Sequence, residues 1–375
     1  MLLKKGIEVE QFIGQKDGQV LPLSALICQN LPGFTVEPDQ RNVEYITSPT
    51  ESYDDLLKYL VESRMRLREF LSDQDPNWTI VPGSALSLPF DKGFIFSKPE
   101  EPYHQHIYES HGVNVITTSL HFNIGLDDPE EIIRLVNLLR MEAPLILALS
   151  ASSPFYDGKI TGNQSHRWSI FPKVPEHIPF FKDHQDYCEW LNLSVQQGKL
   201  FNIRHFWGAV RPNGPNRPSE INRIELRIAD LCTKWDLTLA LMAWIELRVQ
   251  HFLSNPELKV PPEDYSLIHL SDENESLAAT SGLSAHFSDW VLERETTVYE
   301  AIELRLEEDR DLAESLGISK YLKPIERVLL EGNEATHKID KYEQGFSISQ
   351  IMEDWVEESA EEDASLYVDS LKRTA

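Results

Sequence analysis

Near its start the chain reads Gly6-Ile7-Glu8-Val9-Glu10-Gln11-Phe12-Ile13, a run in which apolar and polar side chains largely alternate. Because successive side chains of a β-strand point to opposite faces of its sheet, this alternation predicts a strand. Glu8 and Glu10 then share one face, opposite to Ile7 and Val9. A carboxylate pair of this kind usually faces solvent, so a charged surface and a cation site are both open interpretations here.

A second acidic cluster begins at Glu37 and continues into an expected strand, Val43–Thr47. Within that strand Glu44 has apolar neighbours on both sides, and a buried carboxylate without a partner is energetically costly. Either a metal ion or an arginine would offset this cost. The sequence therefore marks Glu44 as a residue that needs a strong partner, without saying which one.

Two later stretches repeat the pattern of polar groups on one strand face: Ser119–Gly125, within an expected strand over 113–125, and Asn222–Ile228. In the first, His121 and Asn123 point the same way, although a lone histidine on a strand is more often a hydrogen-bonded core residue than a ligand. In the second, Glu225 and Arg227 share a face, which a self-paired surface would explain equally well.

Four strands with polar faces together predict a sheet whose concave side is polar. The residues expected to line that side are Glu8, Glu10, Glu44, His121, Glu225 and Arg227. Carboxylate oxygens are the ligands that Mg²⁺ prefers, and Mg²⁺ in turn binds nucleotide phosphates. The four strands therefore favour a site that holds metal ions.

The rest of the chain predicts an α+β protein whose C-terminal third is helical. Apolar residues at helical spacing indicate helices over 52–71, 129–149, 234–253, 288–306, 309–316 and 318–330. We expect a core over residues 1–285 and a helical extension packed on it over 286–375. The acidic segment from about residue 350 is expected to be a solvated helix or a frayed tail.

Acidic side chains outnumber basic ones by 61 to 35 among 375 residues, which gives a formal net charge of −26. Binding to nucleic acid or to anionic membranes needs basic surface, so we expect neither partner. No apolar run reaches the length of a membrane-spanning helix, and the N-terminus lacks a signal-peptide pattern. Three widely spaced cysteines, Cys28, Cys188 and Cys232, fit a reduced cytoplasmic protein, monomeric or homodimeric.

Common nucleotide-binding motifs are missing from the sequence. Only Gly158-Lys159-Ile160-Thr161 is similar to the end of a P-loop, and Ser153 stands where the first glycine of that loop is required. A phosphate-handling protein without such a loop would have to hold its nucleotide through metal ions and arginines.

Five blocks follow one another between residues 6 and 232, with a weaker sixth near the C-terminus. They are Gly6-Ile7-Glu8-Val9-Glu10, Glu44-Tyr45-Ile46-Thr47-Ser48-Pro49, His121-Phe122-Asn123, Ser150-Ala151-Ser152-Ser153-Pro154-Phe155, Ile224-Glu225-Leu226-Arg227 and Gly332-Asn333-Glu334-Ala335. In this order they resemble the blocks of glutamate–cysteine ligases. The serine-rich block, with Ser165-His166-Arg167 after it, resembles the bacterial carboxylate–amine ligase branch, and its cyanobacterial members in particular. Asn123 stands where that branch usually has a second histidine.

The resemblance implies a glutamine-synthetase-like fold, in which an antiparallel sheet curves into a funnel with helices on its outer face. Two or three Mg²⁺ ions are implied at the centre of the funnel, with ATP as co-substrate. The implied reaction joins the γ-carboxylate of L-glutamate to the amine of L-cysteine through a γ-glutamyl phosphate. Its product, γ-glutamylcysteine, is formed in the first step of glutathione biosynthesis.

The resemblance also implies roles for individual residues. The implied metal ligands are Glu8, Glu10, Glu44, His121 and Glu225, with Glu37 as a further ligand. Arg227, beside Glu225, would stabilise charge on the transferred phosphoryl group. Arg204 and Arg211 would bind ATP with it, or else form structural ion pairs. Glutamate would be bound by Arg167, Ser152, Ser153 and Asn123, since an arginine offers a planar fork to a carboxylate.

Two other functions remain open at this level. A ligase of the same fold could use another amine acceptor, because the metal-binding blocks would be shared and only the acceptor pocket would differ. A non-catalytic protein could also keep the fold, but the presence of all the central acidic residues argues against it.

Overall fold

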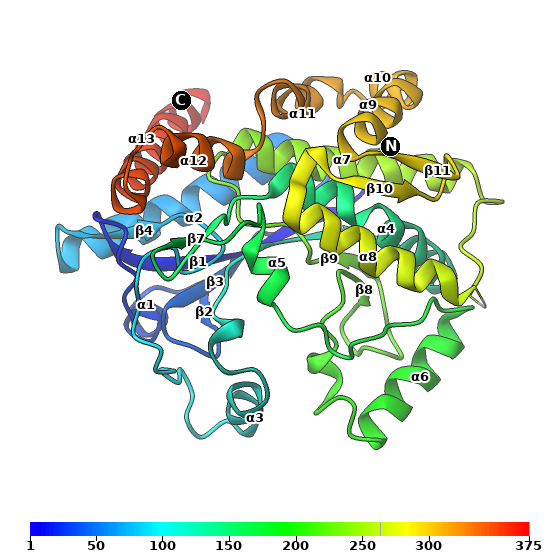
Figure 1. Cartoon of the computed structure of the whole chain (residues 1–375), viewed down its shortest axis with the longest axis horizontal. Helices are drawn as coiled ribbons and strands as arrows, with labels where there is room; N and C mark the ends of the chain where they lie inside the picture. The colour runs from blue at the N-terminus through cyan, green and yellow to red at the C-terminus, as the bar shows by residue number, and fades with distance from the viewer. Residues whose placement is uncertain (263, 375) are drawn as a thin grey trace.

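The strand predicted near the N-terminus is β1, Lys5–Gln15, in a computed structural model that describes residues 1–262 and 264–374. It lies inside an antiparallel sheet with the strand order β2-β3-β1-β5-β9-β8, and β4 pairs with it as well (Figure 1). The other strands are β2 Phe34–Val36, β3 Asn42–Ile46, β4 Trp78–Val81, β5 Leu120–Gly125, β8 Val210–Asn213 and β9 Arg223–Leu226. The predicted α+β class with an antiparallel sheet is confirmed.

One face of the sheet is apolar and packs against helices. Ile7 and Val9 of β1 and Phe122 of β5 are fully buried in this core. The three long helices that pack into it are α2 Tyr53–Gln74, α4 Pro129–Ser150 and α7 Trp235–Ser254, as the apolar spacing predicted. Helix α7 is buried on nearly all sides because α2, α4 and α11, Ser319–Glu331, all contact it.

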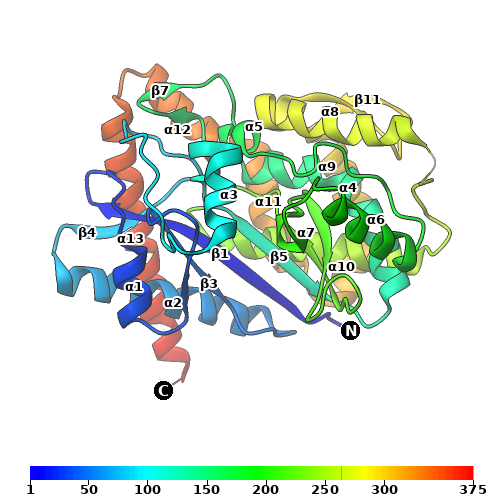
Figure 2. The ribbon, with the colours of Figure 1, turned by 90° about the horizontal axis from the view of Figure 1, so that it is seen from below.

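The other face of the sheet carries the polar side chains and is covered by shorter elements. Helix α3, Pro102–His111, crosses in front of β1 and β3 when the molecule is seen from below (Figure 2). The remaining short elements are α1 Ser24–Asn30, η1 Gly112–Val115, β6 Phe155–Tyr156, β7 Lys159–Ile160, α5 His166–Ile170, α6 His184–Gln196, η2 Ile203–His205, α8 Tyr265–Ser281 and η3 Gly282–Ser284. Residues 112–115 form a 3₁₀ turn, so the strand expected over 113–125 begins only at Leu120.

The C-terminal third is helical except for its first segment. The helix expected over 288–306 is wrong at its start: β10 His286–Asp289 and β11 Arg294–Thr297 form a hairpin there. Asp289 accepts hydrogen bonds from the backbone N–H groups of Val291 and Leu292, which closes a turn instead of a helix. The helices that follow are α9 Val298–Glu308, α10 Arg310–Leu316, α11, α12 Glu334–Glu343 and α13 Ile348–Thr374.

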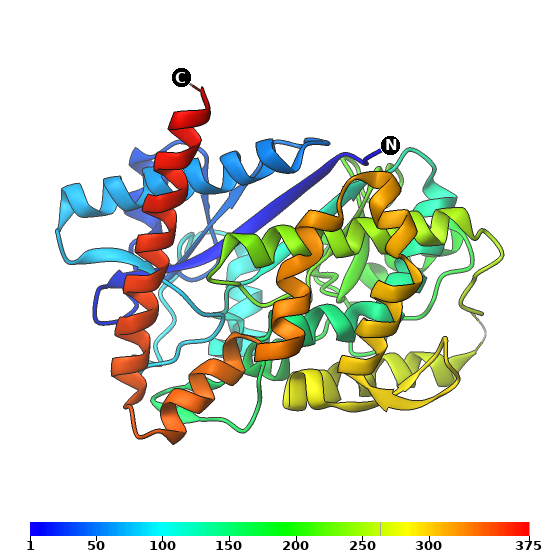
Figure 3. The ribbon, with the colours of Figure 1, turned by 90° about the horizontal axis from the view of Figure 1, so that it is seen from above.

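Helix α13 corrects the expectation of a solvated tail. It crosses α2, as the view from above shows (Figure 3), and Asp363 on it is fully buried. Its N-terminal turns place Ile351 and Trp355 in a second apolar cluster with Phe12 of β1. The acidic composition misled because most of the charges other than Asp363 lie on the outer side of an amphipathic helix. A division of the chain near residue 285 remains a prediction.

Two further expectations can be compared with the structure. Among the residues described, no helix combines the length and apolar character needed to cross a bilayer. Cys28, Cys188 and Cys232 are all free thiols, as expected for reduced cysteines.

Candidate active site

A cavity of about 700 Å³ opens on the polar face of the sheet. Its floor includes Glu8 and Glu10 of β1, and its walls are α3 and the loop around η2. All of its lining residues lie between Glu8 and Arg227 in the sequence. The strands therefore deliver their polar side chains to one enclosed space, and not to an open charged surface.

Strand register brings the predicted residues together in pairs. His121 lies opposite Glu8, and Glu44 lies opposite Glu10, because β1 pairs antiparallel with both β5 and β3. Side chains directly opposite each other in such a ladder are close neighbours. Alternation places these side chains on one face, and the register of β1 with β3 and β5 brings them together.

The hydrogen bonds around His121 leave a place for a cation. Ser119 Oγ donates its proton to Glu10 Oε2 at 2.6 Å, so it accepts from His121 Nε2 at 2.9 Å. In a neutral ring, Nδ1 then carries a lone pair, yet it faces Glu8 Oε2 at 3.1 Å. Two acceptors at this distance repel unless a proton or a metal ion lies between them. Ligand atoms of Glu8, His121 and Glu225 all lie within 4.8 Å of one another, which fits a shared metal ion.

Glu225 is fully buried and surrounded by donors. Arg211, directly opposite on β8, binds both of its oxygens at 2.8 and 2.9 Å, and Arg227 binds Oε1 at 2.9 Å. Burial by itself raises the pKa of Glu225, but the two arginines hold it well below its ordinary value. Glu225 therefore keeps its negative charge inside the protein. The interpretation of this strand as a self-paired solvent-exposed surface is wrong, since the pairing is buried.

Glu37 and Glu44 have the opposite environment. Among the residues described, no Lys, Arg or His nitrogen approaches either carboxylate within 4.0 Å, and Glu44 only accepts a hydrogen bond from Thr35 Oγ1 at 3.0 Å. Burial and the charges of Glu8 and Glu10 raise the pKa of Glu44 to about 8. Burial and neighbouring carboxylates also raise the pKa of Glu37 well above its ordinary value. Glu8, Glu10, Glu37 and Glu44 crowd this side of the cavity, so a bound cation would stabilise their ionised forms. The arginine partner considered for Glu44 is absent from the residues that the structure describes.

Charge changes sign across the sheet. The carboxylates come from β1, β3 and the end of β2, whereas the arginines come from β8, β9 and the loops beside them. Arg211 and Arg227 pair with Glu225, while the guanidinium group of Arg204 lies 5.1 Å from the ring of Tyr103. The cavity thus has an acidic end suited to metal ions beside a basic end suited to anions.

Several lining residues were not identified from the sequence. They are mainly Lys98, Tyr103, His104, Trp207 and Arg217, which come from α3 and from the loops. These segments have no periodic pattern that would assign a direction to a side chain. The one available signal was the density of Tyr and His residues between 103 and 111.

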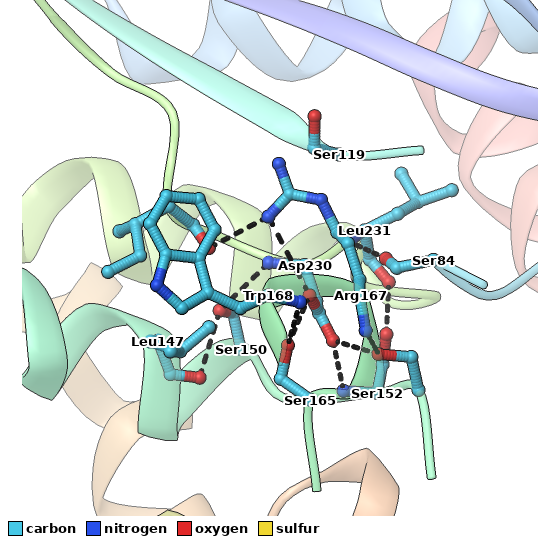
Figure 4. Close-up of polar contacts among 12 residues, drawn as sticks. Ser84, Ser119, Leu147, Ser150, Ser152, Ser165, Arg167, Trp168, Asp230 and Leu231 are labelled. Atoms are coloured by element: carbon cyan, nitrogen blue, oxygen red, sulfur yellow. Dashed lines mark hydrogen bonds and ion pairs between the residues drawn. The ribbon is translucent and has the colours of Figure 1, made fainter. Parts of the chain in front are cut away.

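The predicted glutamate-binding group is not supported by the geometry. Arg167, Ser152 and Ser153 are buried outside the cavity and bond to the protein itself (Figure 4). The two serine side chains donate to Leu231 O and to Asp230 Oδ2, and Arg167 donates to two backbone carbonyls. The local sequence suggested a polar pocket because it could not show that Asp230, more than 60 residues later, occupies it. Asn123 does lie beside the cluster, where its amide donates to Glu8 Oε1 at 3.0 Å.

Solved structures with the same fold define the class of protein. A bifunctional glutathione synthetase from Pasteurella multocida matches 97% of this chain with a TM-score of 0.72 at 17% identity, and this chain spans about half (52%) of its length. A glutamate–cysteine ligase from Francisella tularensis, crystallised with AMP, matches 97% of this chain and 89% of its own, with a TM-score of 0.71 at 14% identity. The fold is therefore that of the glutamate–cysteine ligase and glutathione synthetase type.

The family follows from the sequence as a whole. The model for glutamate–cysteine ligase family 2 matches residues 4–363, and the chain belongs to this family. A protein of Gloeobacter violaceus, provisionally named a glutamate–cysteine ligase 2, is 27% identical over 93% of this chain and 95% of its own length. A Sorangium cellulosum protein with the same provisional name is 30% identical over 64% of this chain and 63% of its own. The resemblance drawn from the sequence blocks is confirmed.

Proposed function

We propose that this protein is an ATP-dependent ligase that joins the γ-carboxylate of L-glutamate to the amine of L-cysteine. The observation that carries the proposal is the convergence of four carboxylates, His121 and Arg227 on one cavity, with the buried Glu225 next to Glu8 and His121. Membership of the glutamate–cysteine ligase family supports the same reaction. The related Francisella enzyme was crystallised with AMP, which supports a nucleotide as one substrate.

In this proposal the acidic end of the cavity holds the metal ions. The ligands would be Glu8, Glu10, Glu44, His121 and Glu225, with Glu37 as a further one. Mg²⁺, when bound, neutralises charge on the phosphates and on the attacking carboxylate, which would otherwise repel each other. The crowding of carboxylates around Glu37 and Glu44, which raises the pKa of both groups, supports this assignment.

The basic end would hold the nucleotide. Arg227 contacts both Glu225 and His121, so it would stabilise negative charge on the phosphoryl group in transfer, with Arg211 and Arg204 along the phosphate chain. A γ-carboxylate oxygen of glutamate would form a bond to the γ-phosphorus as ADP leaves. The cysteine nitrogen would then form a bond to the acyl carbon as inorganic phosphate leaves, and the amine proton would pass to the departing phosphate.

An ADP-release assay with purified protein, L-glutamate, ATP and Mg²⁺ tests this proposal across a panel of amines, with mass spectrometry of the product. We expect ADP release that depends on cysteine. EDTA should abolish this release, and added Mg²⁺ should restore it. Glu8→Gln should lose turnover, whereas Glu62→Gln, on the surface of α2, should retain it. If turnover requires a different amine, that amine is the acceptor in place of cysteine. If no amine of the panel supports turnover, the protein is non-catalytic.

A further inference from the structure

Arg167 is a fully buried arginine whose donors contact the backbone beside the candidate active site. Its Nη2 donates to Arg227 O at 2.9 Å and its Nη1 to Ile228 O at 3.0 Å. It is 2% exposed and does not line the cavity. Both acceptors belong to the segment that presents the Arg227 side chain to the cavity.

That segment lies beyond the regular sheet. Strand β9 ends at Leu226, and after it Arg227 N still donates to Ala209 O at 2.7 Å. The carbonyls of Arg227 and Ile228 have no strand partner in the ladder, and buried carbonyls need a donor. Arg167 supplies both donors from one rigid, planar group. Arg167 therefore supplies the hydrogen bonds that a neighbouring strand would otherwise make. It does so at Arg227, the residue whose side-chain direction matters most for the site.

Asp230 connects Arg167 and the serine-rich loop to the segment 227–230 by hydrogen bonds and an ion pair. Its carboxylate accepts from Ser152 N, Ser153 Oγ and Ser165 Oγ at 2.7 to 3.0 Å, and it lies 3.8 Å from Arg167 Nη1. Ser165 also caps α5 by accepting from Trp168 N, so the helix that carries Arg167 is held at its first turn. Figure 4 shows these groups gathered around Asp230. The loop, α5 and residues 227–230 thus form one hydrogen-bonded unit.

We propose that Arg167 is a positioning residue that acts through Arg227. By fixing the backbone at residues 227 and 228, it sets the direction of the Arg227 guanidinium toward Glu225 and the cavity. This inference rests on the proposed function, since it needs Arg227 to act on a transferred phosphoryl group. A displacement of about 1 Å in such a group can slow turnover about 100-fold, so loss of Arg167 should lower kcat far more than it changes the KM for glutamate.

A double-mutant cycle tests whether the two arginines act as one unit. Arg167→Met and Arg227→Met are made separately and together, and kcat and KM are measured for ATP and glutamate. The expected result is a fall in kcat for each single variant and no further fall in the double variant. Independent, multiplicative losses would overturn the proposal, as would a raised glutamate KM with kcat unchanged in Arg167→Met.

The control is Arg140, which is also buried and donates only to the backbone carbonyls of Pro179 and Ile178. Arg140→Met should lower the melting temperature while its folded fraction keeps the wild-type kcat. If Arg167→Met does not fold, Arg167→Lys takes its place in the cycle and is judged by the same two outcomes.

Binding of Mg-ADP with aluminium fluoride, a mimic of the phosphoryl group in transfer, repeats the cycle without turnover when it is measured by calorimetry. Non-additive losses of affinity support the proposal, and additive losses oppose it. If the wild-type protein forms no product with any amine, the proposed reaction fails, while the binding cycle still decides whether Arg167 acts through Arg227.

Discussion

At the scale of single residues, the half-buried Glu44 and the buried Glu142 are two glutamates with opposite surroundings. Glu142 on α4 binds Arg248 at 2.8 Å and Arg305 at 2.9 Å. Glu44 on β3 faces other carboxylates and accepts a single hydrogen bond from Thr35. A buried charge with arginine partners serves the fold, whereas a buried charge among like charges costs stability and indicates a ligand.

The first prediction follows from this contrast. Glu44→Gln keeps the shape of the side chain but removes a ligand charge, so Mg²⁺-dependent ADP release should fall by roughly two orders of magnitude. In EDTA its melting temperature should stay equal or rise, because repulsion with Glu8 and Glu10 is relieved. Glu142→Gln is the matched control and should lower the melting temperature. If Glu44→Gln lowers the melting temperature and leaves the Mg²⁺ dependence of ADP release unaltered, Glu44 has a structural role and is not a metal ligand.

The second prediction concerns Arg227, which reaches both Glu225 and the cavity. If it contacts the phosphoryl group mainly in the transition state, Arg227→Ala should lower kcat by roughly 10³-fold and change the glutamate KM much less. Steady-state kinetics at saturating Mg²⁺ measures both constants. Arg66→Ala, on the exposed side of α2, is the control and should behave as wild type. A raised KM at constant kcat would assign Arg227 to ground-state binding alone.

At the scale of secondary-structure elements, one ion-pair network joins the C-terminal helices to the core. Glu142 of α4, Arg248 of α7 and Arg305 of α9 form its centre, and Asp309 and Asp289 pair with the outer sides of the two arginines. All five charges are buried, and Glu142, Arg248 and Arg305 each have two ion-pair partners. The network therefore fixes how α9 and the β10–β11 hairpin lie against α4 and α7.

The third prediction is a pH dependence of stability from this network. Burial by itself raises the pKa of Glu142, but Arg248 and Arg305 lower it from its ordinary value of 4.5 to about 2. The unfolded chain therefore takes up the proton first, and the stabilisation is complete above about pH 5 and is lost as the pH falls toward 2. In urea titrations at pH 7, Glu142→Gln should cost about 3 kcal/mol. At pH 3 the variant and the wild type should differ clearly less in their free energy of unfolding. An equal difference at pH 7 and pH 3 would show that ionised Glu142 is not the source of the pH dependence.

At the scale of the whole molecule, the C-terminal helix completes the fold far from the cavity. Asp363 of α13 pairs with Arg64 at 3.0 Å and Arg68 at 2.6 Å on α2. Ser359, one turn earlier, accepts hydrogen bonds from the same two arginines. No residue of α13 lines the main cavity within the part of the chain that the structure describes. The helix thus supports the core without entering the site.

The fourth prediction concerns removal of α13. Ending the chain after Ser347 deletes the buried Ile351 and Trp355 and leaves Arg64 and Arg68 without Asp363. Each such loss costs a few kcal/mol, so the melting temperature should fall by at least about 10 °C. Asp363→Asn alone should give a smaller fall, and Asp354→Asn, half-exposed on the same helix, should give almost none. If the truncated protein keeps the melting temperature of the full chain, the interpretation of this segment as a solvated tail is correct after all.

The sequence by itself determined the faces of the central strands. In β1, β5 and β9 a period of two assigns each side chain to one side of the sheet, and Glu8, His121 and Glu225 lie on the side predicted for them. The long helices were also predictable, because their apolar spacing is local. The order of the blocks was specific enough to identify the family, which the match over residues 4–363 confirms.

Only the tertiary structure decided which partner each polar group has. His121 and Glu8 are 113 positions apart, and Asp230 and Ser153 are 77 apart, so no local pattern could pair them. Arg167 illustrates the consequence: its residue type and its neighbours fit a carboxylate substrate, yet the fold directs it to two backbone carbonyls. The physical reason is that alternation determines the face on which a side chain lies, whereas strand order and loop packing determine what it meets there.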